Sequence, residues 1–314
     1  MTSQSIYRII RTSLMKIEEE IAKLKKERGA TILAHNYQRG EVQDAADFTG
    51  DSLELARKAA SVDADVIVFC GVYFMAETAA ILNPSKTVLI PDPDAGCPMA
   101  DMVNAKDLRE LKAKHPGAVV VSYVNSTAEV KAECDICVTS GNAERVMASI
   151  PGDREVIFVP DRHLGSHVSG LLGRKYILWP GYCPTHARIT VPRIELARKA
   201  HPGAPVLVHP ECAEDVRAAA DERLSTGGMC AFARESKADE IIVGTETGIL
   251  HRLRQENPGK KFWPVDDCAI CPNMKKTTLE SLRDSLRDMK TRVVVDEDVA
   301  ARARRAIEAM LGVA

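Results

Sequence analysis

Three Cys-Pro dipeptides stand at nearly equal intervals along the 314-residue chain. Their cysteines are Cys97, Cys183 and Cys271, which lie 86 and then 88 positions apart. Thiolates that meet in one pocket bind soft cations, so this spacing indicates an iron–sulfur, zinc or copper(I) site if the fold brings the three together. Iron–sulfur clusters ordinarily take four cysteines, and three ligands on a four-iron cluster would leave one iron open as a Lewis acid.

A second set of cysteines, which also includes Cys271, offers an alternative metal site. Cys134 and Cys137, together with Cys268 and Cys271, form two CxxC pairs of the kind that zinc favours. Cys134 and Cys137 fall in the middle of a repeat, away from the loops expected to form the site, so zinc is the weaker interpretation. Packing roles are expected for Cys70, Cys212 and Cys230.

A threefold internal repeat puts one of the three Cys-Pro cysteines in each copy. The tetrapeptide HPGA occurs at 115–118 and 201–204, and a third copy begins at RGATILAHNY. Counted from the glycine of each copy, all three have an acid and then Val at offset twelve, Asp at offset eighteen, and Ser or Thr at offset twenty-three. The aspartates are Asp47, Asp135 and Asp221, and the hydroxyl residues are Ser52, Ser140 and Thr226.

Each copy predicts strands that alternate with helices. The predicted strands are 30–35, 64–71 and 86–93 in the first copy, 118–123, 154–160 and 175–181 in the second, and 204–209, 239–245 and 260–266 in the third. Such alternation is typical of βαβ units with parallel sheets covered by helices. We predict an α/β fold of three pseudo-threefold-related α/β/α layers around a central site. One large doubly wound sheet is the alternative.

The repeats also suggest domain boundaries. We expect an N-terminal helix plus the first repeat in 1–112, the second repeat in 113–198 and the third in 199–284, with 285–314 packing back on the first. The N-terminal helix is predicted from Leu14, Ile17, Ile21 and Leu24, which recur at helical spacing. The C-terminal part predicts a capped helix over 277–290, a strand over 292–296 and a final helix over 297–311.

Polar residues follow the first strand of every repeat, where parallel sheets bind ligands. They include His35, Asn36 and Tyr37 in the first copy, Tyr123 and Asn125 in the second, and His209 and Glu211 in the third. The hydroxyls at offset twenty-three precede helices, so each either caps its helix or presents donors to an anion. His186 stays open between core, supporting and substrate-contacting roles, and His115 and His201 are expected to be turn residues beside Pro and Gly.

Composition excludes several classes of function. The 42 basic and 44 acidic residues give a formal charge of −2, so the chain has no net positive charge that would attract nucleic acid or anionic lipid. No signal peptide or membrane span is evident, which leads us to expect a cytoplasmic protein. Nine cysteines without an export signal argue against a disulfide framework. The nucleotide-binding motifs GxxxxGK[ST] and GxGxxG are absent, which disfavours the usual modes of nucleotide binding.

The motifs HNYQ, GDS, FMAE, GCPMAD, YVNSTAEVKA, TSGNA, GYCPTH, HPEC and CPNM together resemble the quinolinate synthase family over roughly residues 30–314. The resemblance implies a transferase of de novo NAD biosynthesis that condenses iminoaspartate with dihydroxyacetone phosphate to quinolinate, releasing phosphate and water. It also implies three α/β domains around a 4Fe-4S cluster held by one cysteine from each. An iminoaspartate-supplying enzyme is a conceivable partner.

The resemblance carries roles onto individual residues. The cluster ligands would be Cys97, Cys183 and Cys271, the last rather than Cys268 because it directly precedes Pro272. The implied substrate-binding residues are His35, Ser52, Tyr123, Asn125, Ser140, His209, Glu211 and Thr226. Tyr37 and Glu211 would transfer protons, with His35 as a further catalytic residue. Another 4Fe-4S Lewis-acid hydro-lyase is the alternative function, and a redox sensor or electron carrier would not need this acid–base set.

Overall fold

The computed structural model describes residues 3–313, with side chains described from Met15 onward. The first layer contains α1 (Ser3–Glu27), β1 (Ala30–His35), α2 (Gly40–Ala45), β2 (Phe48–Gly50), α3 (Ser52–Ser61), β3 (Val66–Cys70), α4 (Tyr73–Leu82), β4 (Thr87–Leu89) and the 3₁₀ turn η1 (Ala100–Met102). The second contains α5 (Ala105–Lys114), β5 (Val119–Tyr123), α6 (Ala128–Lys131), β6 (Ile136–Val138), α7 (Ala143–Ser149), β7 (Val156–Val159), α8 (Arg162–Leu172), β8 (Ile177–Leu178) and η2 (His186–Arg188). The third contains α9 (Val191–Ala200), β9 (Val206–Val208), α10 (Glu214–Ala219), β10 (Glu222–Arg223), α11 (Thr226–Glu235), β11 (Glu240–Gly244), α12 (Ile249–Glu256) and β12 (Lys261–Pro264), and α13 (Leu279–Asp288) and α14 (Glu297–Gly312) follow it.

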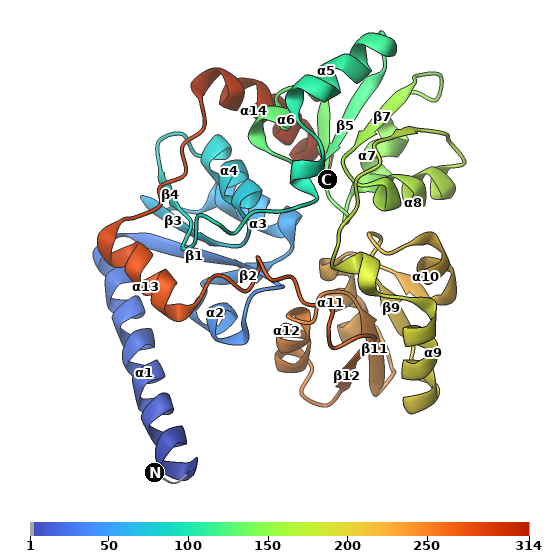
Figure 1. Ribbon diagram of the computed structural model, residues 1–314. Coiled ribbons are helices and arrows are strands. Elements are labelled where there is room, and N and C mark those ends of the chain that lie inside the picture. Colours follow the sequence, from blue (N-terminus) through green and yellow to red (C-terminus); the bar gives the residue numbers. More distant parts are fainter. Residues whose placement is uncertain (1–2, 314) are drawn as a thin grey trace.

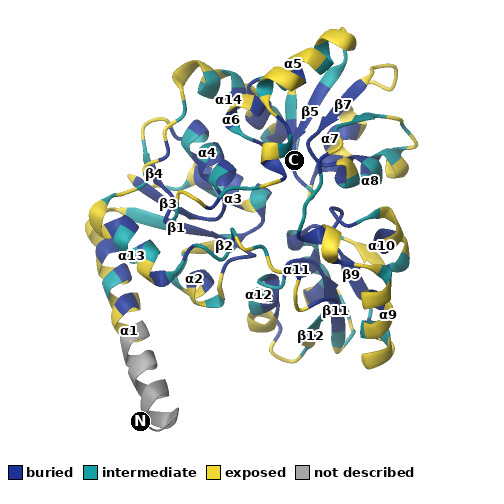
Figure 2. Cartoon of the chain, viewed as in Figure 1, coloured by how far each residue is buried: buried dark blue, intermediate teal, exposed yellow. Residues whose placement is uncertain are grey.

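The three sheets have the same topology. Their strand orders are β2-β1-β3-β4, β6-β5-β7-β8 and β10-β9-β11-β12, and neighbouring strands pair in parallel. Figure 1 shows the three layers arranged around a common centre, and Figure 2 shows that their strands are largely buried while the outer helix faces are exposed. The predicted fold class is therefore confirmed, and the single doubly wound sheet is wrong.

The repeated HPGA tetrapeptide ends a helix and begins a strand. His115 and His201 are the C-caps of α5 and α9. Gly117 and Gly203 follow with φ of 86° and 82°, a left-handed backbone that favours glycine. Each tetrapeptide therefore stops a helix and turns the chain into the first strand of its sheet, as expected of turn residues.

The aspartates at offset eighteen tie two segments of each layer together. Asp47, Asp135 and Asp221 each accept a hydrogen bond from a backbone N–H in or beside the first strand of their layer, at 2.9, 2.7 and 2.7 Å. Because β1, β5 and β9 each pair with the short strand that follows, this contact fixes the loop joining the two. The repeated Asp is thus structural.

The helices at both ends of the chain pack on the layers. Ile17, Ile21 and Leu24 of α1 are buried against α13, as predicted, and the side chain of Leu14 lies outside the described residues. α13 begins with a capping box at Thr278, as its sequence indicates. α14 packs on α4 of the first layer and also on α6 and β6 of the second. The division of the chain at 112, 198 and 284 stays a prediction.

The predicted strand over 292–296 is wrong. Within it, only Arg292 forms a bridge, which is antiparallel to Leu89. Met289 and Thr291 have φ of 50° and 58°, so the chain turns twice where it reaches β4. Pairing is limited to this one bridge, which is flanked by hydrogen bonds from the Ile90 N–H to Thr291 O and from the Val293 N–H to Val88 O. Val294 is left 73% exposed.

Within the described range, no helix combines the length and apolar character that crossing a bilayer demands.

Candidate active site

One central cavity receives a cysteine from each layer. Cys97, Cys183 and Cys271 all line it, each from the loop after the last strand of its sheet, and all three are free thiols. Cys134 and Cys137 instead lie in apolar packing near α14, and Cys268 is exposed. The structure therefore does not bring the two CxxC pairs together.

The three thiols have the same local surroundings. Burial raises the pKa of all three, that of Cys97 to about 12, and the backbone N–H of the residue three positions farther on acts in the opposite direction at each sulfur. The repeated Cys-Pro turn thus directs at least one backbone N–H group toward each thiol. Such groups stabilise a sulfur that has lost its proton to a metal, and hydrogen bonds to sulfur are a known feature of iron–sulfur sites.

The other predicted site residues line the same cavity. They are His35, Tyr37, Ser52, Tyr123, Asn125, Ser140, His209, Glu211 and Thr226. They come from the last residues of β1 and β5, from the loops after β1, β5 and β9, and from the entries to α3, α7 and α11. Equivalent positions of the three repeats therefore face one space. Their roles stay predictions.

The hydroxyls of Ser52 and Thr226 do not cap their helices. The preceding residues do so: the Asp51 side chain accepts hydrogen bonds from two N–H groups of α3, and the Ser225 hydroxyl accepts one from Gly228. Ser52 and Thr226 occupy the first helical position instead. Of the two roles expected for these hydroxyls, capping is therefore excluded for both, and their side chains are left to face the cavity.

The residues one position earlier meet where the three layers touch. Asp51, Thr139 and Ser225 are equivalent in the repeat, and side-chain oxygens of all three lie 3.4 to 3.7 Å from the point where a Cβ on Gly141 would stand. A Cβ on Gly227 would lie only 2.7 Å from Asp51 Oδ2. Glycine at both places lets the three cap residues converge, which sets the hydroxyls beside them around one centre.

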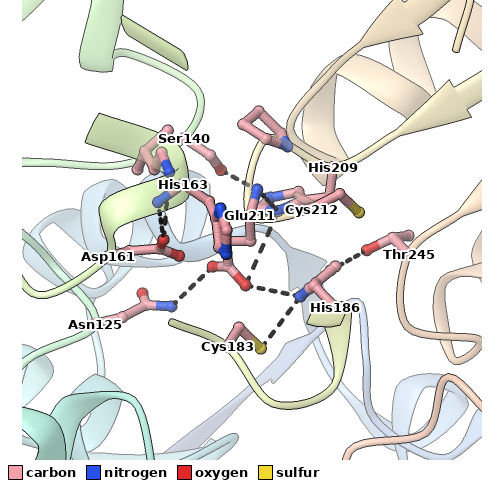
Figure 3. Close-up of polar contacts among 12 residues, drawn as sticks. Asn125, Ser140, Asp161, His163, Cys183, His186, His209, Glu211, Cys212 and Thr245 are labelled. Carbon is pink, nitrogen blue, oxygen red and sulfur yellow. Dashed lines mark hydrogen bonds and ion pairs between the residues drawn. The ribbon is translucent and has the colours of Figure 1, made fainter. Parts of the chain in front are cut away.

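A continuous chain of short contacts joins Tyr37 to Tyr123. The Tyr37 hydroxyl lies 2.5 Å from Thr245 Oγ1, which lies 2.7 Å from His186 Nε2. His186 Nδ1 lies 2.8 Å from Glu211 Oε2, and Glu211 Oε1 accepts a hydrogen bond of 2.7 Å from the Tyr123 hydroxyl. Figure 3 shows the part of this chain from Thr245 to Glu211, with Cys183 beside His186. Hydrogen-bonded groups in such a row can pass protons.

The electrostatics separate one ionised side chain from two neutral ones. Burial raises the pKa of Glu211, but attraction to His186 and hydrogen bonds from His186 and Tyr123 outweigh it and hold that pKa below its usual range. Burial and the Glu211 charge raise the pKa of Tyr37 and of Tyr123 well above 10. Glu211 is therefore a carboxylate and both tyrosines are neutral phenols at neutral pH.

His35 and His209 are held in one tautomer by the same contact. The Tyr37 N–H donates to His35 Nδ1 at 3.1 Å, and the Glu211 N–H donates to His209 Nδ1 at 3.3 Å. Burial lowers the pKa of both imidazoles to about 3, so both are neutral and carry their proton on Nε2. Each histidine thus has an N–H group to offer to a polar partner. His209 offers it to Ser140 Oγ, 3.1 Å away.

Comparison with known proteins identifies the family. The family model described as Quinolinate synthetase A protein matches residues 19–312. This chain belongs to the quinolinate synthase family. Over 297 residues it is 60% identical to the quinolinate synthase of Dehalococcoides mccartyi strain BAV1, covering 95% of this chain and 98% of that protein. The quinolinate synthases of Methanoregula boonei and Thermus thermophilus are 56% and 52% identical, over 94% and 95% of this chain and 97% of each relative.

Membership of the quinolinate synthase family confirms the predicted function as an enzyme of NAD biosynthesis. The alternative of another hydro-lyase is not favoured, because the similar relatives all carry the same name over nearly their full length. One of the cavity cysteines also belongs to a possible metal site. Ligand atoms of Cys183, His186 and Glu211 all lie within 4.8 Å of one another.

Several residues of this site were missed from sequence, including Asp51, Thr139, Thr245, Glu246 and Arg188. Thr245 and Glu246 directly follow β11, and the rule that ligands bind after parallel strands would have found them if applied to the second strands as well as the first. Arg188 lines the cavity from the end of η2, and no sequence signal marks it. His186, which the sequence left open, lies in the contact chain between Thr245 and Glu211.

Proposed function

We propose that this chain condenses iminoaspartate with dihydroxyacetone phosphate in the central cavity, giving quinolinate, phosphate and water. One observation carries the proposal. A thiol from each of the three layers lines the same cavity as a carboxylate base, two phenolic acids and three hydroxyl groups. A condensation that forms a ring and loses water needs both proton donors and acceptors beside a Lewis acid, and these groups stand side by side.

Cys97, Cys183 and Cys271 would hold a 4Fe-4S cluster. Three free thiols on one lining, each facing a backbone N–H group, suit a soft metal centre that takes thiolates. When bound, the cluster would supply an open iron that acts as a Lewis acid toward substrate oxygen or nitrogen. Because each thiol is protonated when no cluster is bound, binding of the cluster would release protons.

The neutral donors of the cavity would hold the substrate anions. Iminoaspartate carries two carboxylates and the other substrate a phosphate, whereas the chain as a whole is slightly acidic. Ser52, Ser140 and Thr226 offer hydroxyls, and His35 offers an Nε2–H that is not titrated near neutral pH. Hydrogen bonds from neutral groups to ions are stronger in a buried pocket than in water, so these donors would add to the charge of Arg188 on the same lining.

Proton transfer would be divided between Glu211 and Tyr37. The ionised Glu211 would accept a proton from the substrate, and the neutral Tyr37 would donate one to a leaving hydroxyl. Thr245 and His186 link the two side chains, so a proton taken at one could be returned at the other. Among the described residues, Asn125 Oδ1 is buried without a hydrogen-bond partner, which suits it to accept an N–H from the substrate.

An anaerobic assay tests this function. The purified protein, reconstituted with iron and sulfide, is given dihydroxyacetone phosphate and freshly generated iminoaspartate, and quinolinate is measured by chromatography. We expect quinolinate and phosphate in equal amounts, and none when iron is chelated. Iron-loaded protein that forms no quinolinate from these two substrates would overturn the proposal.

A further inference from the structure

We propose that Asn36, held by Arg252, is a positioning residue that fixes the Thr226 hydroxyl as a donor into the cavity. The inference rests on the proposed function, because it assigns this donated hydrogen to an anionic group of the substrate or product. It concerns two residues, Asn36 and Arg252, to which neither the motifs nor the comparisons give a role.

Asn36 bridges two layers from a fully buried position. It directly follows β1 in the first layer, and its side chain is 0% exposed. Its Oδ1 accepts a hydrogen bond of 2.9 Å from Arg252 Nη1, and its Nδ2 donates one of 3.0 Å to Thr226 Oγ1. Arg252 comes from α12 and Thr226 from α11, both in the third layer.

The chemistry of the partners fixes the direction of both hydrogen bonds. A guanidinium can only donate, so the amide atom that faces Arg252 must be the oxygen. The amide nitrogen then faces Thr226 and can only donate. The Thr226 hydroxyl therefore accepts from Asn36 and keeps its own hydrogen for another partner. Within the described residues it has no acceptor, and it lies on the cavity lining, so that hydrogen is available to a ligand.

Arg252 is itself held in place. Its Nε donates a hydrogen bond of 2.6 Å to Glu256 Oε1, one turn farther along α12, and its Nη1 also lies 3.4 Å from Glu54 Oε2 in the first layer. Its side chain is 16% exposed. The orientation of the Asn36 amide is thus set from outside the cavity, by a cation that does not line it.

The same arrangement occurs independently at the next layer boundary. His209 Nδ1 accepts the Glu211 N–H, so Nε2 carries the hydrogen and donates to Ser140 Oγ, which also keeps its own hydrogen free. Ser140 and Thr226 are equivalent in the repeat, and each receives a donor from the layer that follows it around the centre. At the third boundary the equivalent positions are Val124, which has no side-chain donor, and Tyr123, whose hydroxyl already donates to Glu211. Two of the three hydroxyls are thus fixed as donors, which suits a ligand with more than one carboxylate.

A double-mutant cycle tests the role of Asn36. Asn36→Asp keeps the size and the contact with Arg252, but its second oxygen can only accept, so it draws the Thr226 hydrogen away from the cavity. Calorimetric titration of the cluster-loaded enzyme with quinolinate (pyridine-2,3-dicarboxylate) should show binding weaker by about tenfold or more, the scale of one hydrogen bond to a charged group. In a Thr226→Val background the same change should cost no more than about twofold, since the hydroxyl is gone and only added charge remains.

Further variants separate the outcomes. If Asn36→Asp does not fold, Arg252→Met is the second variant, because Arg252 is partly exposed and its removal leaves the Asn36 amide free to rotate. The loss of quinolinate affinity caused by Arg252→Met should likewise vanish in the Thr226→Val background. Arg254→Met, at an exposed position of α12 that does not line the cavity, is the matched control for Arg252 and should bind quinolinate as the wild type does. An equal loss in both backgrounds would overturn the inference and leave the proposed function standing. Cluster-loaded wild type that binds no quinolinate would overturn both.

Discussion

Oε2 of Glu211 lies 2.8 Å from Nδ1 of His186, and the two side chains are only 5% and 2% exposed. The same Nδ1 lies 3.2 Å from Sγ of Cys183. One buried histidine therefore contacts both the carboxylate proposed as the base and a thiol proposed as a metal ligand. The carboxylate proposed for proton transfer and the thiol proposed for metal binding are thus different side chains next to one histidine, so mutation can test the two proposed roles separately.

Glu211→Gln should abolish turnover and leave the cluster in place. The amide keeps the size of the carboxylate but cannot accept a proton, and positioned acid–base groups are typically worth about 10²- to 10⁴-fold in rate. The rate of quinolinate formation and the visible absorbance of the anaerobic protein measure the two effects. Glu214→Gln, at an exposed position of the same layer, is the matched control and should be fully active. An active Glu211→Gln enzyme would refute the role of this carboxylate.

Replacing Cys97, Cys183 or Cys271 by Ser should remove the iron–sulfur absorbance, because each would take away one of three thiolates that a cluster needs here. Iron and sulfide content per chain after anaerobic reconstitution measures the loss. Cys268→Ser is the matched control, since that thiol is exposed and lies three positions before Cys271 on the same loop. Full iron content in any of the three variants would show that the ligand set is wrong.

Glu246→Gln should loosen the loop that carries Cys271. Glu246 is 0% exposed, and its carboxylate accepts hydrogen bonds from the N–H groups of Cys271, at 3.1 Å, and Gly248, at 2.7 Å, and pairs with Lys275 Nζ at 3.0 Å. An amide would leave Lys275 without its counter-charge. Its NH₂ group would also face one of the N–H groups that now donate to the carboxylate, those of Cys271 and Gly248. Breaking one partner of a buried pair typically costs about 3–5 kcal/mol.

Two measurements check the Glu246 prediction. Cluster loss to an iron chelator should be several-fold faster than in wild type, and the thermal midpoint should fall. Glu235→Gln, at an exposed position of α11, should change neither. Wild-type rates of iron loss in Glu246→Gln would mean that the Cys271 loop is held by other contacts.

The repeat made most of this architecture predictable from sequence. Many residues at equal offsets have equivalent positions, so the strand ends and the hydroxyls could be placed around one centre, and the nearly equal spacing of the Cys-Pro turns placed the cysteines there as well. The strand predicted over 292–296 was wrong because β-branched residues favour strands, whereas a strand also needs a neighbouring strand to pair with, which the local sequence does not specify. There, Thr291 with φ of 58° turns the chain just before it meets Leu89.

Contacts between layers were out of reach for a different reason. Asn36 and Arg252 are 216 positions apart in the chain, and nothing in the sequence around either residue says that a residue of α12 faces the loop after β1. Equivalent positions do not help, because Val124 and Pro210 stand where Asn36 does in the other copies and neither offers an amide side chain. Asymmetry between repeats carries specificity, and only the packed structure displays it.

The glycine of each HPGA turn should matter for stability in a way that an ordinary loop glycine does not. Gly203 has φ of 82°, and nothing lies within 4 Å of where its Cβ would stand, so Gly203→Ala tests backbone strain without a clash. A left-handed backbone costs an L-residue about 1–2 kcal/mol, and we expect Gly203→Ala to lower the free energy of unfolding by that amount. Gly152→Ala is the matched control: it has equal space but no positive φ, so its stability should stay at the wild-type value or rise slightly. Thermal unfolding of the cluster-loaded protein measures both, and equal midpoints for the two variants would mean that the turn can relax to a right-handed form and that HPGA is repeated for some other reason.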